Sequence, residues 1–196
     1  MKERTRILAL LVLSLVALGG RGPATAADWD VSRLMQSLAQ QRGGRVAFSE
    51  KKYIAILDRP VESSGELVYQ PPARLEKRTL TPRVETLVLD GDLLVVERGK
   101  QKYTLQLQQY PEIAAFIDSI RGTLAGDLKM LERQYRVDLQ GNPEHWTLTL
   151  LPSDVRLGAV LHRIQISGTR DELRQIEMLQ ADGDRSVMNI HPVARR

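Results

Sequence analysis

The stretch SSGELVYQPPARLEK, residues 63–77, places two consecutive prolines between residues that favour a β-strand. Leu67, Val68 and Tyr69 precede the prolines and are typical strand residues. Pro71 and Pro72 have no backbone N–H, so they remove two donors that an internal strand would use for its ladder. We therefore expect this segment at an edge or a corner of a sheet, where the chain bends and the missing donors face solvent.

Short segments with strand character lie on both sides of this stretch and are separated by turn signals. The clearest turn is Asp90-Gly91, because a two-residue type I′ turn needs positive φ and Asp-Gly supplies it. We predict eleven strands, over residues 48–57, 66–69, 74–80, 84–89, 93–98, 102–108, 135–140, 146–151, 161–167, 173–180 and 186–190.

Two segments have helical spacing instead. In residues 28–42, Asp30 is a predicted N-cap, Trp29 is placed to contact Leu34, and Gly43-Gly44 ends the helix. Residues 110–135 carry apolar side chains at three- and four-residue steps, and Pro111 fits a first helical turn. Gly122 and Gly126 predict a bend in this segment or a division into two short helices.

The N-terminus has the three parts of a secretory signal peptide. A basic start (Lys2, Arg4 and Arg6) precedes an apolar run over residues 7–18, and Ala24-Thr25-Ala26 is a cleavage motif. The apolar run is too short for the roughly 20 residues that span a bilayer, so we predict cleavage near Ala26 and a periplasmic protein. Residues 27–196 contain no repeat or linker and are predicted to form a single domain.

Composition excludes several classes of function. Removing residues 1–26 takes four basic residues and one acidic residue from a chain of net charge +4, so the remainder carries about +1 and gives no argument for nucleic-acid binding. The chain has no cysteine, which excludes disulfides, thiolate metal sites and an acylated cysteine. His145, His162 and His191 show no metal-ligand spacing. We predict no metal, no cofactor and no catalytic residue.

A large antiparallel sheet must cover its apolar face, and the two helical segments are the available cover. The resulting fold class is mainly β, with a single strongly curved antiparallel sheet of about eleven strands under an N-terminal helix and an inserted helical lid. The apolar interior could enclose a cavity large enough for acyl chains, or the helices could fill it completely. Both alternatives bury the same residues, so composition leaves them open.

The order of elements resembles the outer-membrane lipoprotein carrier (LolA-like) proteins of the periplasm over almost the whole mature chain. The similar features are the N-terminal helix, the pair Phe48-Ser49, the run 65–69 before the proline corner, and Val88-Leu89-Asp90-Gly91 before its strand. The resemblance implies an unclosed half-barrel sheet with helices as a lid over an apolar cavity. It also implies a carrier that moves lipid-like cargo between membranes without covalent change.

The corner departs from the pattern Arg-Pro-x-x-Phe-x-Trp of that family, in which the arginine holds the lid closed. Here the position of the arginine is Pro71 and that of the phenylalanine is Leu75, so the arginine's role has no counterpart at this position. The helical run AGDLKMLERQY and the closing GDRSVM are similar to LolA-related proteins encoded with lipid or aryl-polyene pigment biosynthesis.

We therefore expect a monomeric carrier of a lipid or an acylated lipoprotein, loaded by an inner-membrane donor and unloaded by an outer-membrane acceptor. An alternative is a lipid-sensing or partner-binding module on the same fold. A third hypothesis, an esterase, needs a base beside Ser49, Ser63 or Ser64, and the sequence identifies none. The candidate cavity residues are Phe48, Leu67, Tyr69, Leu75, Leu87, Leu89, Leu94, Val96, Leu105, Leu107, Ile113, Phe116, Ile117, Ile120 and Leu124.

Overall fold

The computed structural model describes residues 29–193, and the predicted signal peptide lies outside this range. The described chain forms eleven strands: β1 Gly44–Tyr53, β2 Val61–Gln70, β3 Arg74–Thr81, β4 Glu85–Asp90, β5 Leu93–Arg98, β6 Gln101–Gln106, β7 Tyr135–Asn142, β8 His145–Pro152, β9 Leu161–Thr169, β10 Glu172–Gln180 and β11 Arg185–Pro192. The helices are α1 Val31–Leu38, the 3-10 helix η1 Leu107–Gln109, α2 Pro111–Ala125, α3 Leu128–Glu132 and α4 Val155–Gly158.

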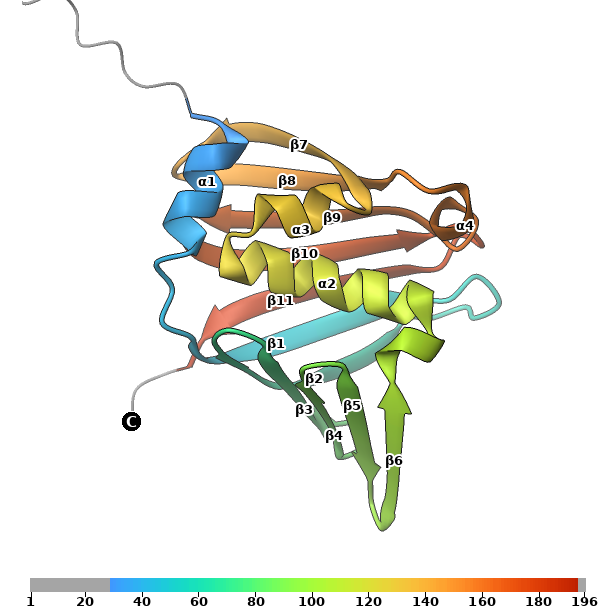
Figure 1. Cartoon of the computed structure of the whole chain (residues 1–196). Coiled ribbons are helices and arrows are strands. Elements are labelled where there is room, and N and C mark those ends of the chain that lie inside the picture. The colour runs from blue at the N-terminus through green and yellow to red at the C-terminus, as the bar shows by residue number, and fades with distance from the viewer. Residues whose placement is uncertain (1–28, 194–196) are drawn as a thin grey trace, which may run out of the picture.

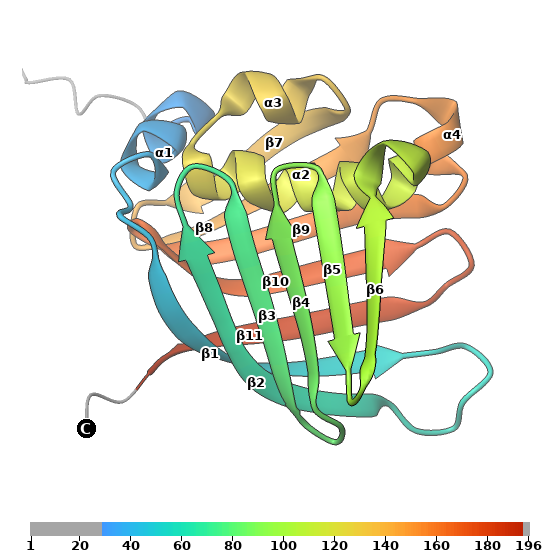
Figure 2. The ribbon, with the colours of Figure 1, turned by 60° about the horizontal axis from the view of Figure 1, so that its bottom comes forward.

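All eleven strands belong to one antiparallel sheet with the order β6-β5-β4-β3-β2-β1-β11-β10-β9-β8-β7. The sheet curves strongly, so that β2 to β6 stand across from β8 to β11 (Figure 2). Helices α1, α2 and α3 lie on the concave side, which we call the inner face (Figure 1). The predicted fold class, an unclosed curved sheet covered by an N-terminal helix and an inserted helical segment, is confirmed.

The helix boundaries follow the predicted signals. The side chain of Asp30 accepts a hydrogen bond from the Arg33 N–H and caps α1. Pro111 is the first residue of α2, and Gly126 ends that helix in the left-handed region at φ 64°. The 110–135 segment is therefore two helices. A Cβ at Gly126 would lie 2.1 Å from the Met35 carbonyl oxygen, so this glycine also allows α2 to contact α1 closely.

The proline corner is the turn between β2 and β3, and both prolines are exposed. Both strands are internal in the sheet, so of the two expected positions the corner is the one observed, and the edge is not. The bend is tolerated because Pro71 and Pro72 follow the last residue of β2 and precede the first residue of β3, where no ladder bond is lost.

Several element boundaries differ from the prediction, and β2 begins at Val61, five residues before the predicted start at residue 66. The first strand covers residues 44–53 instead of 48–57, because the chain turns at Ile54, whose carbonyl accepts from the Leu57 N–H at 2.9 Å. The strand expected over 102–108 ends at Gln106, and η1 turns the buried Leu107 inward. The short helix α4 occupies a connection that was expected to be irregular, and Asp154 caps it.

Two separate clusters of buried apolar side chains lie on the inner face. The large cluster joins α1, α2, α3 and α4 to β7, β8 and β9, and its buried residues are Leu34, Met35, Leu38, Ala115, Leu131, Tyr135, Trp146, Leu148, Leu150, Leu157, Leu161, Ile164 and Ile166. The small cluster has three buried residues, Leu89, Leu94 and Leu107, with seven partly buried side chains around them. Helix α2 contributes residues to both clusters.

Candidate functional site

The strand register places nine of the ten predicted sheet positions of the cavity on the inner face, and the tenth, Leu107, lies in η1 instead of a strand. Tyr69, Leu75, Leu89, Leu94 and Leu105 form one row across β2 to β6. The next row along the strands contains Leu67, Leu87 and Val96, and Phe48 pairs with Gly65 of β2 in the row after that. Because the alternation along each strand has period two, these side chains share one side of the sheet.

The predicted lid positions divide between the two clusters. Ile113 and Ile117 of α2 pack on the small cluster, together with Leu107 of η1. Phe116 and Ile120 pack on the large cluster. Leu124 is half-buried and belongs to neither cluster. Helix α2 therefore crosses the boundary between the two halves of the sheet, as Figure 1 shows.

A strip of the inner face between the clusters is apolar and belongs to neither of them. Val46, Leu67, Tyr69 and Met188 are half-buried in this strip. Phe48 is buried at its centre, at 2% exposure. We call these five residues the central strip. They come from β1, β2 and β11, so the strip lies in the middle of the sheet.

Helix α2 is tied to the β4–β5 turn by a single hydrogen bond from a partly buried side chain. The Arg121 guanidinium donates to the Gly91 carbonyl at 2.9 Å, and its Nη1 lies 3.8 Å from a carboxylate oxygen of Asp118. Burial raises the pKa of Asp118, although the Arg121 charge opposes that shift. Burial also raises the pKa of Tyr69. This polar contact lies at the end of the central strip that α2 covers.

Two depressions formed by described residues lie elsewhere. The larger, about 590 Å³, is lined mainly by polar side chains of the outer face of β7 to β11, including Thr147, Ser167 and Gln175. The smaller, about 210 Å³, involves the ends of β1, β2 and β3 and includes Ser49 and Ser64. Neither is lined by residues of α2. In this structure the helix packs directly on the inner face.

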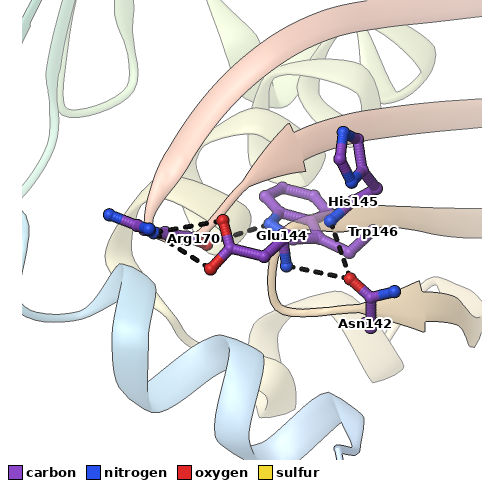
Figure 3. Close-up of polar contacts among 5 residues, drawn as sticks. All are labelled: Asn142, Glu144, His145, Trp146 and Arg170. Atoms are coloured by element: carbon purple, nitrogen blue, oxygen red, sulfur yellow. Dashed lines mark hydrogen bonds and ion pairs between the residues drawn. The ribbon is translucent and has the colours of Figure 1, made fainter.

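The turns beside the larger depression form a rigid corner (Figure 3). The indole N–H of Trp146 donates to the Arg170 carbonyl at 2.9 Å, and Arg170 pairs with Glu144. The Asn142 side chain accepts from the backbone N–H groups of Glu144 and His145. His145 is therefore a turn residue at the start of β8, as the sequence indicated. These contacts hold the β7–β8 turn against the β9–β10 turn.

One polar contact was missed by the sequence. Ser49 Oγ lies 3.3 Å from Nε2 of His191, on the outer face of β1 and β11. The sequence could not identify this histidine as a neighbour of Ser49, because strand pairing joins residues 142 positions apart. Within residues 29–193, however, no carboxylate is bonded to His191, so an orienting third group is missing from this pair.

Among the described residues, no cluster of three or more histidine, cysteine, aspartate or glutamate side chains could hold a metal ion. No helix of residues 29–193 is long and apolar enough to cross a bilayer. The inner face is therefore the feature from which a function can be argued.

Comparison with known families agrees with this geometry. Residues 23–194 match the family model described as outer membrane lipoprotein carrier protein LolA-like. Since the match covers most of the chain, the protein belongs to this family of carrier and binding proteins. A search of curated proteins found no match.

Solved structures with the same general arrangement are distant in sequence. A LolA superfamily protein from Nitrosomonas europaea is 11% identical with a TM-score of 0.47, and the match covers 86% of this chain and 96% of that one. A chain of the MucA/MucB complex from Pseudomonas aeruginosa is 16% identical with a TM-score of 0.46, over 85% of this chain and 59% of that one. A chain of the complex of the CwlD amidase from Clostridioides difficile with the GerS lipoprotein is 12% identical with a TM-score of 0.39, over 76% and 82% of the two chains.

Proposed function

We propose that this protein is a periplasmic carrier that binds the acyl part of a lipid or lipoprotein on its inner face and moves it from the inner to the outer membrane. The observation that carries the proposal is the central strip. Its apolar side chains lie between the two clusters on which α2 packs and belong to neither of them. An acyl chain would bury this surface further, at about 25 cal/mol per Å² of apolar area removed from water.

Binding requires helix α2 to move away from the central strip, because the helix packs directly on the inner face. Its attachment to the β1–β6 half of the sheet is small: the side chains of Ile113, Ala114 and Ile117, and the hydrogen bond from Arg121 to Gly91. Its other end is fixed to α1 and α3 at Gly126. Opening would therefore separate α2 from the small cluster while the large cluster stays intact.

The family arginine that is absent at Pro71 has a physical counterpart in this scheme. Arg121 holds the helix to the β4–β5 turn from the helix side, whereas the family pattern places an arginine in the corner before the third strand. Transfer to an acceptor would then need only a partner with higher affinity for the same acyl chain. The donor and acceptor proteins at the two membranes remain part of the proposal.

The first test is native mass spectrometry with lipid extraction on the mature protein from its own periplasm. A co-purifying acyl compound would support the carrier function. A protein that is free of acyl compounds and also fails to bind an apolar fluorescent probe would contradict it.

The second test changes the lid. Ile117→Glu should weaken binding of an apolar probe at least about tenfold, because a charge placed against the small cluster costs well over 1.4 kcal/mol unless it is solvated. Ile56→Glu is the matched control, since the Ile56 side chain is 90% exposed on the β1–β2 loop. Circular dichroism verifies that both variants fold. Equal probe affinity of the two folded variants would show that α2 does not cover the binding site.

A partner-binding or sensing role is the alternative. A pull-down that recovers a membrane signalling protein, together with the absence of bound acyl compounds, would favour it over the carrier.

A further inference from the structure

The inner face of β1 to β4 changes from apolar to polar along the strands. The row nearest α2 contains Tyr69, Leu75 and Leu89. Lys77 enters the next row between Leu67 and Leu87, and the row after that contains Thr79 and Glu85. Glu50 and Ser63 follow, still on the inner face. Figure 2 shows the direction of this gradient, from the turns beside α2 to the β3–β4 turn at the opposite end.

The centre of the polar end is Glu50, whose side chain is only 6% exposed. Its Oε2 accepts from Lys77 Nζ at 2.6 Å and from the Ser63 hydroxyl at 3.3 Å. Its Oε1 accepts from the Ser186 hydroxyl at 2.7 Å and lies 3.8 Å from Lys52 Nζ. Three hydrogen-bond donors and one further ammonium group, from four strands, thus surround this carboxylate, which leaves it little capacity to accept from a ligand.

The lysines have the unused hydrogen-bonding capacity. An ammonium group carries three N–H donors. In the described structure Lys77 donates to Glu50 alone, and its Nζ lies 4.9 Å from the centre of the Phe48 ring. The Lys77 side chain is 24% exposed, so the remaining N–H groups can reach a ligand. Lys52 is 51% exposed and contacts the same carboxylate only at long range.

The charges do not balance at this end of the inner face. Burial pushes the pKa of Glu50 up, but the charges of Lys77 and Lys52 and the hydrogen bonds outweigh it and hold the pKa below its ordinary value of 4.5. At neutral pH the group therefore consists of one carboxylate and two ammonium ions. Glu85 is paired with Arg98 and does not neutralise the excess. The net charge of the group is positive.

We propose that Lys77, with Lys52, binds the anionic head group of an acyl amphiphile whose chain lies along the central strip. Lys77 adjoins the strip at Leu67, so one molecule can occupy both parts. The anionic group of this ligand is either a fatty-acid carboxylate or a phospholipid phosphate. Uncharged glycerides and alcohols have no such group. This inference rests on the proposed carrier function and specifies the chemical class of its cargo.

The test compares ligands that differ only in head-group charge. A fluorescent long-chain fatty acid is titrated against the alcohol of the same chain, and phosphatidylglycerol is compared with the corresponding diacylglycerol as a competitor of the bound probe. The wild-type protein should bind the charged member of each pair about 10- to 100-fold more tightly, the range expected for a charge-assisted hydrogen bond. Inorganic phosphate alone should not displace the probe, because the acyl chain supplies much of the binding.

The variant is the double substitution Glu50→Gln with Lys77→Met, which removes both charges and so avoids an unpaired buried ion. It should bind the alcohol as the wild type does and lose most of the preference for the acid, because Lys52 alone remains to bind the anionic group. The matched control is Glu97→Gln with Lys102→Met, which removes the exposed ion pair between β5 and β6. The control should keep the preference.

The outcomes separate the two proposals. A wild-type protein that binds the alcohol as tightly as the acid overturns the head-group site and leaves the carrier function standing. An unchanged preference for the acid over the alcohol in the double variant also overturns the head-group site and leaves the carrier function standing. A preference for only one charged ligand, either the fatty acid or phosphatidylglycerol, supports the head-group site and shows whether a carboxylate or a phosphate occupies it. Displacement by inorganic phosphate alone would assign the lysines to a free anion instead of an amphiphile. Failure of the wild type to bind any of these ligands overturns both proposals.

Discussion

The two halves of the sheet carry cores of very different completeness. Strands β7 to β9 are covered by α1, α3 and part of α2, and thirteen side chains are buried there. Strands β3 to β6 are covered by η1 and the start of α2, and only three side chains of that cluster are buried. One half therefore stabilises the fold, and the other presents an apolar surface under a thin cover. This division suits a protein that must open on one side without unfolding.

The largest expected effect compares one leucine from each half. Leu150→Ala removes a side chain of 0% exposure from the large cluster and should lower the free energy of unfolding by about 2–5 kcal/mol. Leu87→Ala removes a partly buried side chain of the small cluster and should cost about half as much or less, because its site is already partly open to solvent. Denaturant unfolding measures both values. Equal losses would mean that the two halves are equally well packed.

The next prediction concerns Gly126, where the end of α2 contacts α1 of the large cluster. Gly126→Ala places a Cβ against the Met35 carbonyl in a left-handed residue, so backbone strain of about 1–2 kcal/mol adds to about 1–3 kcal/mol for the displacement of α1. Gly99→Ala is the matched control, because Gly99 has a similar φ of 60° and no atom lies near its added Cβ. The difference in unfolding free energy between the two variants isolates the contact. Equal stability would show that α1 adjusts freely.

A smaller effect is expected at Glu50, near the boundary between the halves. Glu50→Gln should destabilise the protein by about 1.5–3 kcal/mol at neutral pH, since the substitution weakens charged hydrogen bonds to a nearly buried group. The pKa of Glu50 is lower in the folded protein than its ordinary value of 4.5, so the ionised carboxylate contributes stability above that value. This contribution is lost as the pH falls through the folded pKa.

The measurement is the difference in unfolding free energy between wild type and Glu50→Gln as a function of pH. The difference should be largest at neutral pH and shrink as the pH falls below 4.5. A difference that stays constant at acidic pH would show that the carboxylate is not ionised in the folded protein. Arg45 and Glu66 form an exposed ion pair, so Glu66→Gln is a control with a much smaller expected change.

The alternation of apolar and polar residues, together with the turn-forming residues between the alternating segments, predicted most of the fold. Eleven strands follow from period-two patterns with turn residues between them. The turn after β4 was predicted one residue too early, because Asp90 pairs with Leu93 and the two-residue loop is Gly91-Asp92, in which only Gly91 has positive φ. The division of residues 110–135 into α2 and α3 follows from Pro111, which begins α2, and Gly126, which ends it. These signals are local, since each depends on residues within a few positions of one another.

The tertiary structure decided which distant residues meet. Neither the group of Glu50, Lys77 and Ser186 nor the pair of Ser49 and His191 has a sequence signature, because sheet pairing joins strands that are far apart in the chain. The turn at Ile54 and the inward turn at Leu107 likewise depend on where the neighbouring strands end. The sequence by itself determined most of the elements, whereas the face of each strand that looks inward was decided by the tertiary structure. The closeness of α2 to the sheet, and the charge at the end of the inner face, depended on long-range packing.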